Sequence, residues 1–123
     1  MIDSNKYEQK TPEWTLAKFL ESWKGRNWEK MLDYCQISWL SLYKEPKKII
    51  NTRFHQKLLD AEILKIEEIS EVTRDISIKI RIKNINIVKK LKRKARLICE
   101  KGVMQPSING KWGVNPTSMG YER

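Results

Sequence analysis

One segment of the chain alternates so regularly between apolar and polar residues that it restricts the fold more than any other feature. Between positions 76 and 83 every second residue is isoleucine, and the residues between them are Ser77, Lys79, Arg81 and Lys83. A period of two predicts a strand buried on one face. The wider stretch 76–101 holds ten basic residues and one acidic residue, in a chain whose net charge is +10. The sequence therefore predicts a sheet with an apolar inner face and a strongly positive outer face.

The composition fits one small folded domain. The chain has 123 residues, of which 40% are hydrophobic and 33% charged, a balance typical of globular rather than disordered proteins. We expect a flexible N-terminal tail at 1–10, a single domain at 11–118 and a C-terminal tail at 119–123. These residues contain no signal peptide and no run of eighteen apolar residues. A cytoplasmic protein is expected, or an extracytoplasmic one if the chain is a fragment.

A first helix is predicted at about 12–24. Thr11 can accept hydrogen bonds from its free N–H groups, Pro12 suits the first helical position, and Gly25 ends it. Trp14 and the apolar residues that follow at helical spacing give the helix one face for the core.

Two further helices are predicted before the strands. Asn27 can cap a short second helix, and the apolar stretch 37–43 is expected to continue it irregularly over the core. Pro46 opens a third helix that runs to about Leu59.

The period then changes to two, which predicts about four strands. The first begins near Ala61, and a slip in its apolar phase indicates a bulge around Glu67 and Glu68. The others are expected at 75–84, 89–101 and 111–116, the last introduced by an Asn-Gly turn. Helices followed by antiparallel strands that are apolar on one face predict an α+β fold with the helices on one side of the sheet.

The order of these elements resembles the nuclear transport factor 2-like superfamily. The resemblance covers nearly the whole chain and rests on the capped first helix at Thr11-Pro12-Glu13, the segment 25–32, the third helix and the closing segment 109–116. It is closest to small bacterial or phage-type members without an assigned activity, and more distant from the accessory domains of conjugation and type IV secretion subunits. It implies a cone, in which three helices pack on the concave face of the curved sheet.

Enzymes of this superfamily use an Asp or an Asp–His pair, often with a Tyr, inside the cone. The predicted inner rows of the strands contain no such residues, and the chain has one histidine, His55. We therefore expect a protein that is not an enzyme and needs no cofactor or metal.

The predicted positive surface of the sheet is the strongest candidate for binding. Like charges side by side on paired strands oppose folding unless anions or acids lie nearby. A protein partner or self-association is expected, with nucleic acid and an anionic membrane surface as alternatives, and a solvated face that blocks aggregation as the simplest reading. The surface comprises Lys79, Arg81, Lys83, Lys90, Lys92, Lys94 and Arg96.

The candidate pocket residues are Arg93 and three aromatic residues. Arg93 interrupts the inner row of its strand, where it must bind a carboxylate such as Asp33 or Glu13, bind an anionic ligand, or reach solvent at the rim. Tyr34, Trp39 and Trp112 are expected around a pocket mouth, although most of the tryptophans are expected in the core.

The sequence leaves three functions open. The favoured one is a non-enzymatic binding or assembly module that contacts a partner through its basic sheet. The alternatives are a nucleic-acid-associated protein that uses Lys79 to Arg96, and a small-molecule enzyme or carrier that uses the cone interior. Cys35 and Cys99 are expected to be buried free thiols, although one bridge between them stays open.

Overall fold

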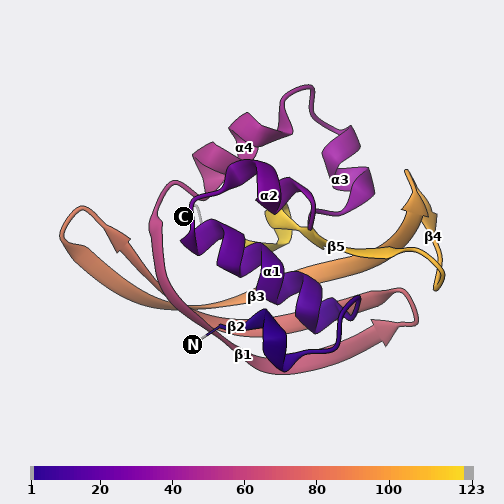
Figure 1. Cartoon of the computed structure of the whole chain (residues 1–123), viewed down its shortest axis with the longest axis horizontal. Helices are drawn as coiled ribbons and strands as arrows, with labels where there is room; N and C mark the ends of the chain where they lie inside the picture. The colour runs from indigo at the N-terminus through magenta and orange to yellow at the C-terminus, as the bar shows by residue number, and fades with distance from the viewer. Residues whose placement is uncertain (1, 121–123) are drawn as a thin grey trace.

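The computed structural model describes residues 2–120, which form short helices packed on one face of a curved, open antiparallel sheet (Figure 1). The fold class is α+β, as predicted. The helical segments are η1 (Ser4–Lys6), α1 (Pro12–Lys24), α2 (Trp28–Leu32), α3 (Ile37–Ser41), α4 (Pro46–Arg53) and η2 (Pro116–Met119). The strands are β1 (Lys57–Ser70), β2 (Thr73–Asn84), β3 (Ile87–Gly102), β4 (Gln105–Pro106) and β5 (Lys111–Asn115).

The first helix begins and ends as its sequence predicts. The hydroxyl of Thr11 accepts a hydrogen bond from the N–H of Trp14 at 3.2 Å, and Gly25 follows the last helical residue. One face of α1 is fully buried against the sheet and includes Leu16, Leu20 and Trp23.

The later helices differ from the prediction at their ends. Asn27 caps α2, as expected, but the stretch after it forms a separate helix, α3, rather than a continuation. The separation arises because the N–H of Gln36 donates to the carbonyl of Val114 on β5, at 2.8 Å, instead of to a helical carbonyl. Helix α4 ends at Arg53, earlier than predicted, because the chain enters β1 at Lys57.

The sheet has the strand order β1-β2-β3, and β3 also pairs with β4 and β5. Strands β2 and β3 form one long hairpin in continuous register, closed by Ile85 and Asn86. Strand β5 pairs only with Arg96–Glu100, so the part of β3 nearer the hairpin tip has no strand beyond it within the described residues. Figure 1 shows the hairpin extending away from the helices.

Strand β1 is longer and more irregular than predicted. Its register with β2 shifts between Leu58 and Asp60, between Ile63 and Lys65, and between Glu68 and Ser70. The third shift lies close to the predicted bulge, and the first two were not foreseen. Bulges increase the local twist of a strand, and they accompany the curvature of this sheet.

The core lies between the helices and the inner face of the sheet. All four isoleucines of the alternating segment are buried, as predicted. Phe54 packs edge to face against both Phe19 and Trp23, with ring centroids 5.4 and 4.9 Å apart. Cys35 and Cys99 are buried and free, as expected.

The two ends of the chain pack more closely than tails would. Ile2 and Ser4 are buried, and the backbone N–H and hydroxyl of Ser4 both donate to the carboxylate of Glu21, each at 2.8 Å. At the other end Met119 is buried in the core, and residues 121–123 lie outside the described residues. The packed unit therefore extends beyond the predicted limits of 11 and 118.

No helix among the described residues is long and apolar enough to cross a membrane.

Candidate functional site

The predicted basic residues of β2 and β3 do lie side by side on the outer face of the sheet. Lys79 is directly opposite Lys92, and Arg81 is directly opposite Lys90. Lys83 continues the row toward the tip. None of these five side chains forms an ion pair with another residue of the described range. We call them the basic hairpin.

Lys94 and Arg96 do not belong to this unpaired set. Lys94 forms an ion pair of 3.3 Å with Glu67 of β1, and Arg96 binds both carboxylate oxygens of Asp75 at 2.8 and 2.9 Å. The hydrogen bonds and positive charge of Arg96 lower the pKa of Asp75, despite the partial burial of that carboxyl. The expectation of seven equivalent cations is therefore corrected to five unpaired and two neutralised ones.

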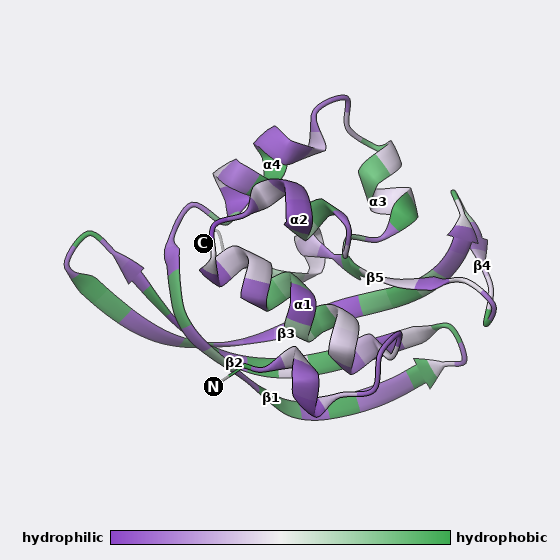
Figure 2. Ribbon diagram, in the orientation of Figure 1, coloured by the Kyte–Doolittle hydropathy of each residue, from purple (hydrophilic) through white to green (hydrophobic). Residues whose placement is uncertain are grey.

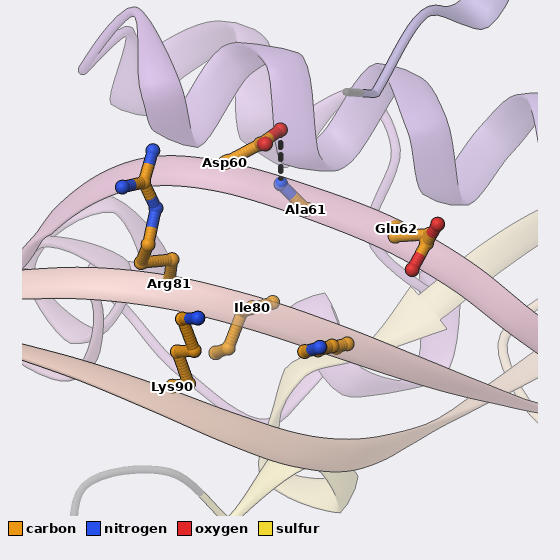
Figure 3. A pocket seen from close by; sticks show the side chains of 7 residues that line it. Asp60, Ala61, Glu62, Ile80, Arg81 and Lys90 are labelled. Carbon is orange, nitrogen blue, oxygen red and sulfur yellow. Dashed lines mark hydrogen bonds between the residues drawn. The ribbon is translucent and has the colours of Figure 1, made fainter.

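Acidic residues from β1 border the basic hairpin on one side. In the register of the strands, Asp60 is opposite Arg81 and Glu62 is opposite Lys79. Between them lies a shallow cavity of about 260 Å³ on the sheet face (Figure 3). It is lined by Asp60, Ala61, Glu62, Lys79, Ile80, Arg81 and Lys90. The predicted face is thus positive toward β3 and mixed in charge toward β1.

Arg93 lies in the inner row of β3, opposite Ile78, as predicted. It is partly buried, and its Nη1 donates to the carbonyl of Lys92 at 2.9 Å. Its Nε is buried without a hydrogen-bond acceptor. Neither suggested carboxylate, that of Asp33 or Glu13, forms an ion pair with it. Arg93 lines neither of the two cavities described in this section.

A second cavity, of about 430 Å³, lies beside α1 where the chain leaves α2 and where β5 begins. It brings together two of the predicted residues, Tyr34 and Trp112, with Trp14 of α1. Trp14 and Tyr34 meet edge to face, with ring centroids 5.8 Å apart. The remaining lining residues are Lys10, Thr15, Asp33, Gly110 and Lys111. We call this cavity the aromatic pocket.

The third predicted aromatic, Trp39, lies elsewhere. It is a buried residue of α3, its indole N–H donates to the hydroxyl of Thr117 at 2.9 Å, and its ring packs against the partly buried Tyr43. Trp14 takes its place at the pocket. Helical spacing assigned Trp14 to the core, and only its position at the start of α1, near the edge of the buried face, could have indicated otherwise.

Charged groups surround the rings of the aromatic pocket. The ammonium of Lys18 lies 5.7 Å from the ring centroid of Trp14, and the guanidinium of Arg74 lies 5.1 Å from that of Trp112. Burial raises the pKa of Tyr34, and the charges of Asp33 and Glu21 raise it further. The Tyr34 hydroxyl therefore stays protonated at neutral pH and can donate a hydrogen bond.

The described residues hold no group of three or more His, Cys, Asp or Glu side chains that could bind a metal ion. His55 is exposed after α4, where its Nδ1 lies 2.9 Å from the carbonyl of Thr52. His55 does not line the aromatic pocket, where Asp33 and Tyr34 lie.

Comparison with known proteins identifies a similar fold. No family model and no curated protein sequence match the chain. Among solved structures, a SEC-C motif containing protein from Psychrobacter arcticus is similar, with a TM-score of 0.69 and 12% sequence identity. The match covers 91% of this chain and 63% of that protein, so the chain spans less than two thirds of its length. At this identity the likeness establishes the fold alone.

Proposed function

We propose that this protein is a non-enzymatic binding module that contacts an anionic partner through the basic hairpin. The observation that carries the proposal is that Lys79 is opposite Lys92 and Arg81 is opposite Lys90, and that none of the four forms an ion pair with a described residue. Like charges directly opposite each other on paired strands lower the stability of the sheet. A partner that supplies negative charge would remove this repulsion and bind four neighbouring cations.

The surroundings of the basic hairpin favour this reading over a merely solvated face. Elsewhere on the same face the chain does provide acids, since Glu67 pairs with Lys94 and Asp75 with Arg96. None of the five cations nearer the tip forms an ion pair with a described residue, even though Asp60 and Glu62 of β1 lie opposite Arg81 and Lys79. The absence of aromatic rings among these five residues argues against base stacking, and therefore against single-stranded nucleic acid as the partner.

The arrangement of short helices on a curved sheet also supports our inference that the chain is a nuclear transport factor 2-like protein. Proteins of one fold carry many functions, so this inference does not by itself select a partner.

Retention on an immobilised polyanion, heparin, tests the proposed function. The double variant Lys79→Gln/Lys92→Gln should elute at clearly lower salt than the control Lys24→Gln/Lys44→Gln. The control removes the same charge from two exposed positions outside the sheet. Equal elution of the two variants would show that net charge alone governs binding, and the proposal would fail.

The aromatic pocket supports a second candidate function, the binding of a small molecule with a flat ring and an acidic group. Three aromatic rings line it for stacking, and Lys10 and Lys111 supply positive charge. A thermal-shift screen of aromatic carboxylates tests this function. A compound should raise the melting temperature of the native protein and of Trp39→Phe but not of Trp112→Ala. Equal shifts in Trp112→Ala, or no shift with any compound, would exclude it.

A further inference from the structure

The tip of the β2–β3 hairpin carries a cluster of exposed aliphatic side chains. Ile85 is 84% exposed, Ile87 is 61% exposed and Val88 is 49% exposed. Figure 2 shows this hydrophobic tip at the end of a mostly hydrophilic stem, well away from the helices. Isolated exposed aliphatic residues are common, but three within four positions make the end of this protrusion apolar.

The conformation of Ile85 adds an independent observation. Its φ is 58°, in the left-handed region that β-branched residues rarely adopt. An asparagine or glycine would fit there with less strain, and Asn86 is the next residue. Both the strained backbone and the exposed side chain lower the stability of the fold. Folding therefore does not explain why position 85 is an isoleucine.

Positive charge begins immediately behind the aliphatic tip. Lys83 is opposite Val88, and Lys89 is opposite Ile82, one step further along the ribbon. Arg81 and Lys90 follow. Each step along a strand is about 3.3 Å, so these four cations lie within roughly 7 to 14 Å of the tip.

Acidic residues occur only further from the tip than Lys83. On β1, Lys57 is opposite Lys83, and Asp60, opposite Arg81, is the first acidic residue along the register. The part of the sheet nearest the tip is therefore positive on all three strands, with aliphatic side chains in front of it.

We propose that the hairpin tip inserts into the interface of an anionic lipid bilayer. The proposal rests on the proposed function and names its partner. Ile85, Ile87 and Val88 enter the boundary between headgroups and acyl chains, which accepts apolar groups to a depth of about 5–10 Å. Lys83, Lys89, Arg81 and Lys90 then lie at the level of the lipid phosphates and anionic headgroups.

The shape of the tip favours a bilayer over the other anionic partners. A convex aliphatic protrusion needs a matching hollow on a protein, whereas a fluid interface deforms around it. Nucleic acid provides phosphate for the lysines but no apolar medium for Ile85. Only the bilayer uses both halves of the arrangement, the aliphatic tip and the cations behind it.

Co-sedimentation with vesicles tests the inference. We expect the full chain to bind vesicles of phosphatidylcholine with 30% phosphatidylglycerol, and not vesicles of phosphatidylcholine alone. Binding should weaken as salt increases, since each cation near an anionic surface contributes on the order of fivefold in affinity.

Two pairs of variants distinguish vesicle binding through the hairpin tip from nonspecific binding through other exposed residues. Ile85→Ser should reduce vesicle binding several-fold, whereas Met104→Ser should not. Met104 is a close match, because it is 79% exposed, has a φ of 55° and sits in a turn at the other end of β3. Lys83→Gln/Lys90→Gln should likewise bind more weakly than Lys24→Gln/Lys44→Gln.

A probe at the tip reports insertion directly. Asn86→Cys can be labelled selectively with an environment-sensitive fluorophore, because Cys35 and Cys99 are buried. A blue shift of the label on anionic vesicles supports insertion, and no shift contradicts it.

The outcomes distinguish the inference from the proposed function. Heparin retention that depends on the basic hairpin, without vesicle binding, overturns the membrane inference and leaves the proposed function intact. Tight binding to a DNA duplex that Ile85→Ser does not affect, together with weak vesicle binding, identifies nucleic acid instead. If neither heparin nor vesicles distinguish the hairpin variants from their controls, both proposals fail.

Discussion

Lys79 and Lys92 lie directly opposite each other on β2 and β3, and neither forms an ion pair with a described residue. Repulsion between the two ammonium groups lowers the stability of the sheet at this point. A sequence selected for stability alone would place opposite charges at these two positions.

We predict that Lys92→Glu stabilises the fold. The new carboxylate would face Lys79 and replace repulsion by attraction, raising the free energy of unfolding by about 0.2–1 kcal/mol. Urea denaturation at low salt measures the effect, which should shrink at high salt. The gain should disappear in the background of Lys79→Gln; a gain that persists there would show that the Lys79–Lys92 pair is not its cause.

The ion pair between Asp75 and Arg96 should make stability depend on acid pH. Arg96 lowers the pKa of Asp75 below its ordinary value of 3.8, so the unfolded chain binds a proton more readily than the native one. The stabilisation is therefore complete above that pH and is lost as the pH falls through the lower, native pKa.

We expect Asp75→Asn to lower the free energy of unfolding by about 1 kcal/mol at pH 7. Hydrogen bonds to charged groups contribute about 1.5–3 kcal/mol when shielded from water, and solvent screens this pair because the Arg96 side chain is 45% exposed. The difference from the native chain should narrow in unfolding measured below pH 3.8. Glu71→Gln, at an exposed turn position, is the control and should change little. A constant deficit for Asp75→Asn at all pH values would contradict the ion-pair explanation.

Both thiols should resist alkylation in the native protein. Burial raises the pKa of Cys35 from 9.0 to about 12, and burial also raises that of Cys99. Because the thiolate is the reactive form, Cys35 should react with iodoacetamide on the order of a thousandfold more slowly at pH 8 than an ordinary thiol. Mass spectrometry of native and urea-unfolded samples checks this, and rapid native labelling of either cysteine would contradict the buried placement.

Gly113 is predicted to tolerate no side chain. A Cβ there would lie 2.5 Å from the Cα of Gln36 and 2.7 Å from the carbonyl oxygen of Cys35, both backbone atoms. Gly113→Ala should therefore lower the free energy of unfolding by about 1–3 kcal/mol or more.

Gly25→Ala provides the matched control. The nearest atom to a Cβ at Gly25 is 3.5 Å away, and its φ of −80° suits alanine. That substitution should be neutral or stabilise by about 0.4–1 kcal/mol, because it restricts the unfolded chain. Chemical denaturation of the two variants side by side would refute the close-approach argument if they behaved alike.

The sequence predicted those features that depend on neighbouring residues alone, such as helix starts and the two faces of a strand. The alternation of isoleucine with basic residues identified β2 and its two faces, and the caps Thr11 and Asn27 identified two helix starts. The side-by-side pairing of Lys79 and Lys92 followed from the same alternation in the neighbouring strand.

Features that depend on distant segments were missed. Helix α3 separates from α2 because Gln36 bonds to β5, almost eighty positions later. The acids that neutralise Lys94 and border Arg81 come from β1, whose bulges hide its register from any simple periodicity. The aromatic pocket was half predicted, because Tyr34 and Trp112 flank it while Trp14 joins them only through the placement of α1.

The close approach at Gly113 also has a consequence for the aromatic pocket. The N–H of Val114 donates to the carbonyl of Tyr34 at 2.8 Å, so the strand that carries Trp112 is tied by its backbone to the loop that carries Tyr34. Two walls of the pocket are thus preorganised, and a ligand would meet them without first having to order a mobile loop. The amide hydrogens of Gln36 and Val114 should accordingly exchange with deuterium only when the whole domain opens.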